Sequence, residues 1–308
     1  MHIPSSMIDG AVCPVTAAVS MAGIALAATL AWKSAKKPTS LRFAAVSALV
    51  FAGQMVNFPV QSGTSGHLLG GVLAAALLGV PFGVLAIALV ISLQCLVFAD
   101  GGFSALGANL LNMAVLGAGL GGWVWQRLAD ASPNCRLLTL GLAAWFSVLL
   151  AAFACSVELA AAGTIPFFQV APVMVGIHAL IGLGEAGITV AVMSLLAIPA
   201  LRASERRPVF LLGISAFIIA LVVAPFACRW PDGLESVAGS LRFLHESAPV
   251  FVAPLRDYSI PALSSAMLST ALAGGIGAIL TFGAAWGIAS SWRRCPASKQ
   301  PSMPHSIP

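Results

Sequence analysis

Two histidines are placed where they could bind a transition-metal ion, His2 and His67. The α-amine of Met1, the backbone amide nitrogen of His2 and the His2 imidazole can hold one ion in fused chelate rings. With His67 as a fourth nitrogen the donor set becomes planar, and nitrogen donors in a square plane favour Ni(II) or Cu(II) over Mg(II) or Ca(II). Alternatively, His67 caps a helix and His2 has no ligand role; spacing alone leaves both interpretations open.

The second histidine lies in residues 57–71, a polar stretch rich in glycine that interrupts an otherwise apolar sequence. Glycine and small hydroxyl residues allow the backbone to turn tightly and to approach another segment closely. We therefore expect this loop to present His67 to an ion, with its glycines lying against the N-terminal backbone.

The composition requires a membrane environment for these residues. Hydrophobic residues make up 59% of the chain and charged residues 8%, against about 25% charged residues in soluble domains. Apolar stretches of about 17 to 25 residues recur without the alternation of a barrel, so the predicted fold class is all-α, a polytopic transmembrane helical bundle. Six scattered cysteines without a CxxC pair indicate neither a zinc site nor a disulfide framework.

About seven spans followed by a two-span C-terminal module account for the apolar stretches. The stretch 68–78 is short and ends at Gly79-Val80-Pro81, which is typical of broken helices that line a cavity in transporters. The predicted spans are 12–32, 43–56, 68–78, 82–98, 106–128, 137–159, 170–195, 209–226 and 263–288.

The basic residues indicate the orientation of these spans. Placing the N-terminus outside puts twelve of the 15 Lys and Arg residues on the cytoplasmic side and leaves only Arg229, Arg242 and Arg256 outside. The net charge of +5 is therefore explained by orientation, and nucleic-acid binding is not expected. The C-terminus is predicted to be cytoplasmic, and the cavity beside residues 68–78 to open outward.

The charged segment 202–208 suggests a boundary between two modules. We predict a membrane domain over residues 1–200 and a two-span module over 208–292, with an outer loop at 229–261. The tail, residues 293–308, is rich in Pro, Ser and Lys and is predicted to be disordered.

Ionisable residues within the apolar stretches are further candidates for function. His178 and Glu185 lie seven residues apart and share a helix face, and Glu158 lies near the outer end of the preceding span. They could form a proton relay or ligate an ion, but we favour an interhelical hydrogen-bond clasp. Polar residues at the outer ends of spans and in the loop could form a second shell that orients the histidines, or could pair with each other and the loop backbone: Gln54, Asn57, Ser65, Asn109 and Asn112.

Several motifs resemble those of one transporter family. They are Met1-His2-Ile3-Pro4, residues 54–60 running into Gly63-Thr64-Ser65-Gly66-His67, Asp100-Gly101-Gly102, Gly107-Ala108-Asn109 with Asn112-Met113, and His178-Ala179-Leu180-Ile181-Gly182. Over roughly residues 1 to 200 the chain resembles the CbiM/NikM family, the substrate-binding membrane components of cobalt and nickel energy-coupling factor (ECF) importers. Residues 230–235 and 254–258 resemble the PDGLE module, the CbiN/NikN-like accessory partner.

The resemblance implies that Met1, His2 and His67 bind the metal. It also implies partners on separate chains, namely a transmembrane coupling protein (CbiQ/NikQ-like) and a cytoplasmic ATPase (CbiO/NikO-like). The family continues His-Ile-Pro with Asp-Gly, whereas Ser5 and Ser6 follow here, which leaves the path of the N-terminal segment open.

We therefore predict the metal-capture subunit of an ATP-driven cobalt or nickel importer in the bacterial inner membrane, with no catalytic residues and no cofactor besides the transported ion. The PDGLE-like loop is expected to sit over the cavity and help to load metal. The alternative is a proton-coupled secondary transporter that uses His178 and Glu185. A membrane metalloenzyme would need an acid or base near His67, and the sequence offers only Asp100 and Glu158 at a distance. Cobalt and nickel cannot be separated from the sequence.

Overall fold

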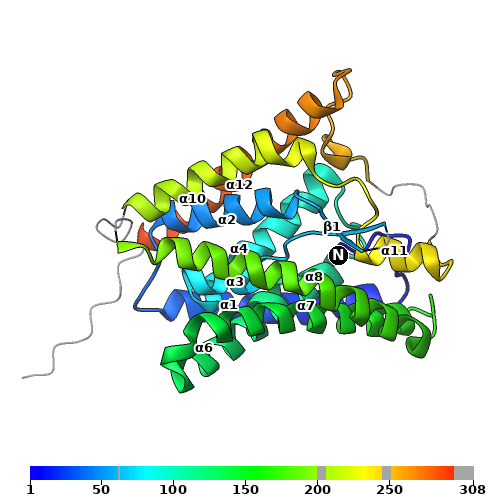
Figure 1. Cartoon of the computed structure of the whole chain (residues 1–308), viewed down its shortest axis with the longest axis horizontal. Helices are drawn as coiled ribbons and strands as arrows, with labels where there is room; N and C mark the ends of the chain where they lie inside the picture. The colour runs from blue at the N-terminus through cyan, green and yellow to red at the C-terminus, as the bar shows by residue number, and fades with distance from the viewer. Residues whose placement is uncertain (62, 200–205, 245–250, 295–308) are drawn as a thin grey trace, which may run out of the picture.

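The computed structural model describes residues 1–61, 63–199, 206–244 and 251–294, and these form a bundle of helices that lie roughly alongside one another (Figure 1). Within these ranges, six helical stretches are long and apolar enough to cross a membrane. Large apolar side chains such as Phe168, which is 88% exposed, cover the outer surface of the bundle, as expected where lipid replaces water. The predicted polytopic helical class is confirmed.

The first half of the bundle contains α1 (Val12–Lys33), α2 (Ser40–Gln54), α3 (Gly71–Leu78) and α4 (Val80–Leu93), and α4 continues as the π-helical segment η1 (Gln94–Phe98). The predicted spans 43–56 and 68–78 therefore correspond to helices of only 15 and eight residues. Seven of the eight residues of α3 are buried, so this short helix is enclosed by protein, as a broken helix at membrane depth must be.

The next elements are α5 (Leu106–Asn109), η2 (Leu110–Gly121), α6 (Gly122–Ala131), η3 (Pro133–Cys135), α7 (Arg136–Ala161) and α8 (Phe167–Leu196). The predicted span 106–128 is one helical stretch whose middle, η2, is π-helical, a local widening that is frequent at functional sites. The helices α7 and α8 pack against each other along their length and form one wall of the bundle (Figure 1).

The C-terminal module begins with α10 (Arg206–Ile218), η4 (Ile219–Val223) and η5 (Ala224–Phe226) and ends with α12 (Ala266–Arg294). Both α10 and α12 pack against α2, so the module is joined to the first domain along a membrane-spanning surface (Figure 1). Between them lie α11 (Gly233–Ser240) and η6 (Arg256–Tyr258). Most of the proposed boundary segment 202–208 and of the tail 293–308 lies outside the described residues, although α12 extends through Arg294.

A short antiparallel hairpin precedes His67, where the sequence suggested an irregular loop. Its strands are β1 (Phe58–Gln61) and β2 (Thr64–Gly66), and Phe58 pairs with Gly66. His67 directly follows this hairpin and lies buried in the bundle interior, shortly before α3 begins.

Candidate metal centre

The first eight residues run into the bundle and place Met1 in its interior, beside α8, α11 and β1 (Figure 1). Met1 is 3% exposed and Ile3 is fully buried. The backbone amide of Ile3 donates to Asn109 Oδ1 at 2.8 Å, and the Ile3 carbonyl accepts from Asn109 Nδ2 at 3.1 Å and from the Gly102 amide at 2.8 Å. The residue after His2 is therefore fixed by hydrogen bonds on both sides.

The glycines that admit this segment are not those of residues 57–71. A Cβ atom on Gly102 would overlap the backbone of Ser5, and one on Gly101 would lie 3.4 Å from His2 Cβ. Gly66, in contrast, faces the side chain of Ile181 on α8. The expectation that the His67 loop glycines lie against the N-terminal backbone was wrong; Asp100-Gly101-Gly102 provides that close approach.

The N-terminal amine and His67 meet in the structure. The Met1 nitrogen contacts His67 Nε2, and His67 Nδ1 donates to the Leu68 carbonyl at 3.0 Å. This backbone bond fixes the tautomer in which Nε2 carries the lone pair, the form in which Nε2 can bind a metal. The carboxylate of Asp232, from the C-terminal module, lies 3.0 Å from the amine and 3.9 Å from His67 Nε2.

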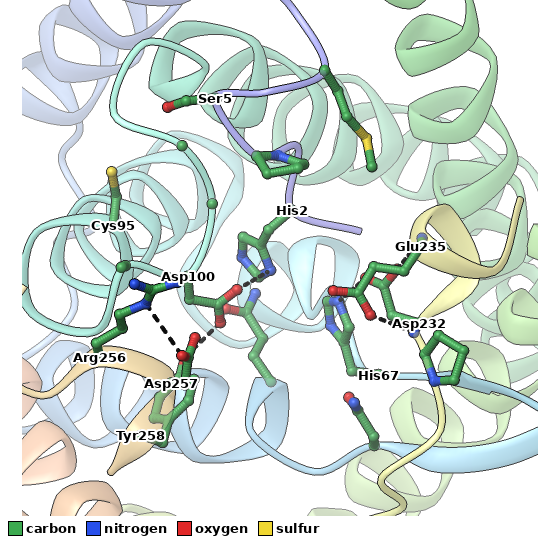
Figure 2. Close-up of a pocket in the computed structure, with 18 of the residues that line it drawn as sticks. His2, Ser5, His67, Cys95, Asp100, Asp232, Glu235, Arg256, Asp257 and Tyr258 are labelled. Atoms are coloured by element: carbon green, nitrogen blue, oxygen red, sulfur yellow. Dashed lines mark hydrogen bonds and ion pairs between the residues drawn. The ribbon is translucent and has the colours of Figure 1, made fainter. Parts of the chain in front are cut away.

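The His2 ring stacks on the His67 ring, with centroids 5.2 Å apart and planes 13° from parallel. Figure 2 shows the two rings between Asp100 on one side and Asp232 on the other. His2 Nδ1 lies 3.1 Å from Asp100 Oδ1, and the hydroxyl of Tyr258 donates to the other Asp100 oxygen at 2.6 Å. His2 Nε2 is buried and has no hydrogen-bond partner.

Burial governs the electrostatics of these groups. It lowers the pKa of His67 to about 3, and the adjacent Met1 amine adds to this effect. Burial also lowers the pKa of His2, although Asp100 opposes it. Burial alone would raise the pKa of Asp232, but the Met1 amine and His67 outweigh burial and hold this pKa well below its usual range. At neutral pH both imidazoles are therefore neutral, the form that binds metals.

A cavity of about 1000 Å³ adjoins this cluster and is lined by residues of both modules. Its lining includes His2 and His67 from the first domain and Asp232, Glu235 and Tyr258 from the C-terminal module. Polar and charged groups from both modules thus face the same space (Figure 2). Such a cavity can admit a hydrated cation to the histidines.

Of the five residues predicted to form a second shell, Asn109 reaches the N-terminal segment and Gln54 reaches the His67 loop, where its Nε2 donates to the Leu69 carbonyl at 2.7 Å. Asn57 lines the cavity, and its backbone carbonyl accepts a hydrogen bond from the backbone amide of Cys228. Ser65 donates to the Trp230 carbonyl at 2.8 Å and so holds the C-terminal module. None of the hydrogen bonds described for these four residues is made to an imidazole.

Asn112 instead donates to Glu158 Oε2 at 2.7 Å, which ties η2 to α7. His178 Nδ1 donates to the Met174 carbonyl at 2.8 Å, one turn back on the same helix. Glu185 accepts hydrogen bonds from the amides of Leu69 and Gly70. His178 and Glu185 therefore each bond to backbone, and the structure does not show them bonded to each other.

Three contacts at the site were not predicted from the sequence: Asp232 with the Met1 amine, Asp100 with His2, and Tyr258 with Asp100. These residues lie within the motifs named above, but residues about 100 to 230 positions apart have no sequence spacing from which a contact between them could be predicted. The described residues contain no group of three His, Cys, Asp or Glu side chains that could hold a metal ion. The candidate donor set therefore depends on backbone nitrogen.

A polytopic helical bundle with a buried N-terminal amine and two histidines facing a cavity belongs to the class of metal-transport membrane subunits. Comparison with known families agrees: residues 2–204 match the CbiM family, described as the cobalt uptake substrate-specific transmembrane region, and residues 206–294 match the PDGLE domain. The chain belongs to the CbiM family and carries a fused PDGLE domain. It is a multi-pass membrane component for cobalt or nickel uptake, which confirms the resemblance found in the sequence.

Similar proteins and a solved structure support this assignment, and one relative matches most of the chain. A protein of Archaeoglobus fulgidus provisionally named fused nickel transport protein NikMN is 34% identical, over 91% of this chain and 95% of its own. A cobalt transport protein CbiM of Roseiflexus is 32% identical, over 41% of this chain and 50% of its own. A crystal structure of a transition metal transporter superposes with a TM-score of 0.57 at 29% identity, covering 67% of this chain and 99% of the other.

Proposed function

We propose that the chain is the substrate-capture subunit of an ATP-driven ECF importer and that it binds Co(II) or Ni(II) through the Met1 amine, the His2 amide and imidazole nitrogens, and His67. The contact between the Met1 amine and His67 Nε2 carries this proposal, because two nitrogen donors separated by 66 residues meet beside a cavity. To complete the chelate rings, His2 Nδ1 must turn from Asp100 to the ion.

The proposed energy source lies on separate chains, a CbiQ/NikQ-like coupling protein and a CbiO/NikO-like ATPase. The proposed location is the bacterial inner membrane, with the N-terminus and the cavity outside and the C-terminus cytoplasmic. The uneven distribution of basic residues supports this orientation.

Uptake measurements test this function. Cells that produce the chain together with its coupling protein and ATPase should accumulate cobalt or nickel, and elemental analysis of the purified chain should find one bound ion. Uptake should stop when the ATPase is omitted and should persist when a proton uncoupler is added. Uptake by the chain alone that collapses with the uncoupler would instead support the proton-coupled alternative through His178 and Glu185.

We further propose that the PDGLE domain loads metal through Asp232. Asp232 caps α11 by accepting from the Glu235 amide at 2.9 Å, and its other oxygen reaches the Met1 amine. The residue thus projects from a rigid helix start toward the donors, at the wall of the cavity. A carboxylate in this position attracts a cation and can hold the amine in place until the ion arrives.

Replacement of Asp232 by Asn should slow metal association about tenfold, because removing a charge from a cleft weakens electrostatic steering. Stopped-flow quenching of tryptophan fluorescence on adding Ni(II) measures the rate. Asp257→Asn is the matched control: this carboxylate also lines the cavity, but its side chain is 76% exposed and pairs with Arg256. An unchanged association rate in the Asp232 variant would contradict the loading role.

A further inference from the structure

Glu185 on α8 is a fully buried carboxylate whose two oxygens both accept hydrogen bonds from the loop that carries His67. Oε2 accepts from the Leu69 amide at 2.6 Å and Oε1 from the Gly70 amide at 2.8 Å. Bonds from backbone amides to a carboxylate are among the stronger hydrogen bonds in proteins, and they strengthen further where water is excluded.

The position of these amides explains why a carboxylate is needed. Leu69 and Gly70 directly precede α3, and Gly70, which has a positive φ of 74°, offers no side chain to cap that helix. Amides at the start of a helix lack partners within the helix, and the positive end of the helix dipole favours a negative charge. The carboxylate of Glu185, supplied by another helix, meets both requirements.

The same helix also restrains the backbone on the other side of His67. A Cβ atom on Gly66 would lie 2.7 Å from Ile181 Cγ1, one turn before Glu185 on α8. Gly66 is thus held by packing, while Leu69 and Gly70 are held by hydrogen bonds. Only His67 and Leu68 lie between these fixed points, and His67 Nδ1 bonds to the Leu68 carbonyl.

We propose that Glu185 is a positioning residue for metal capture: its carboxylate fixes the backbone after His67 so that Nε2 stays at the Met1 amine. This role rests on the proposed function of the chain. Glu185 does not touch the ion, and it acts only through His67. Its contribution to metal affinity should therefore disappear when His67 is absent.

The test is a double-mutant cycle with Glu185→Gln and His67→Asn in the full-length protein. A Gln side chain has one accepting oxygen, and its NH2 group would face the second backbone amide. Glu185→Gln should weaken Ni(II) affinity about 10- to 100-fold, the usual effect of changing a group that orients a ligand. In the His67→Asn background, the same substitution should have no further effect on affinity.

The visible absorption spectrum of the bound metal provides a second measurement, which a general loss of protein stability does not shift. With Cu(II) as the probe, loss of one nitrogen donor weakens the ligand field and shifts the visible absorption to longer wavelength. The Glu185→Gln spectrum should shift toward that of His67→Asn. Two controls should keep the parent spectrum: Glu158→Gln removes a different buried carboxylate, and Thr189→Val changes a buried residue one turn further along α8 whose hydroxyl has no partner.

Additive losses of affinity in the cycle, or a parent spectrum in folded Glu185→Gln protein, would overturn the positioning role. Failure of the proposed function gives a different result. If the parent protein itself does not bind Ni(II), or binds it with the spectrum and affinity of the His67→Asn variant, the nitrogen site is wrong regardless of Glu185.

Discussion

Adding two residues, Gly-Ser, in front of Met1 abolishes cobalt and nickel uptake while the bundle still folds. The extension converts the α-amine into a peptide nitrogen, which must lose its proton before it can bind a metal, and so removes the terminal amine that meets His67 Nε2. The amine also anchors the chelate through which the His2 amide would bind. Elemental analysis of the purified protein after growth with each metal measures the accompanying loss of bound cobalt or nickel.

The same two residues inserted between Gly10 and Ala11 provide the control. Both positions are exposed, so the insertion lengthens the chain without changing the donors, and metal content should stay at the parent level. A full complement of metal in the protein extended before Met1 would show that the amine is not a ligand.

Replacing His67 by Asn weakens metal affinity more than about 100-fold, beyond the range typical for changes to groups that only orient a ligand. The variant loses the one imidazole that comes from outside the N-terminal segment, and the shorter Asn side chain offers no nitrogen lone pair. Titration of the purified protein with Ni(II) gives the affinity.

His178→Asn is a closely matched control for this substitution. His178 is also buried, and its Nδ1 also donates to a backbone carbonyl, that of Met174. Its substitution should leave metal affinity within a few-fold of the parent. If the His178 variant loses affinity and the His67 variant keeps it, the candidate site has been assigned to the wrong histidine.

The chemistry of an N-terminal histidine is local, so Met1 and His2 could be paired from the sequence. That His67 joins them was implied only by the resemblance to the CbiM/NikM family, because spacing alone left its role open. Six of the nine predicted spans correspond to helical stretches in the described residues that are long and apolar enough to cross a membrane, because hydrocarbon thickness sets a length that the sequence must match. The short helix α3 is an exception. Its eight residues need not span the membrane, because the surrounding protein buries this helix and shields it from lipid.

The contacts of Asp232 and Tyr258 could not be predicted, because they depend on how two modules pack across α2 and the cavity. Glu185 is an ionisable residue within a predicted span, and an interhelical hydrogen-bond clasp is the favoured interpretation, but its seven-residue spacing from His178 does not identify its partners. Its actual partners are backbone amides of Leu69 and Gly70, and backbone groups leave no trace in a sequence. Positions of side chains relative to loops thus remain the least predictable part of this site.

The contact between Asp232 and the Met1 amine joins two domains that belong to one polypeptide. Covalent connection turns the docking of the second domain into an intramolecular event, with an effective concentration that reaches the millimolar range for short tethers. The Asp232 carboxylate is consequently present beside the Met1 amine in a fixed ratio of one to one, whatever the amount of protein in the membrane. A fused chain therefore needs only a weak interface between the two domains, because dilution in the bilayer cannot separate them.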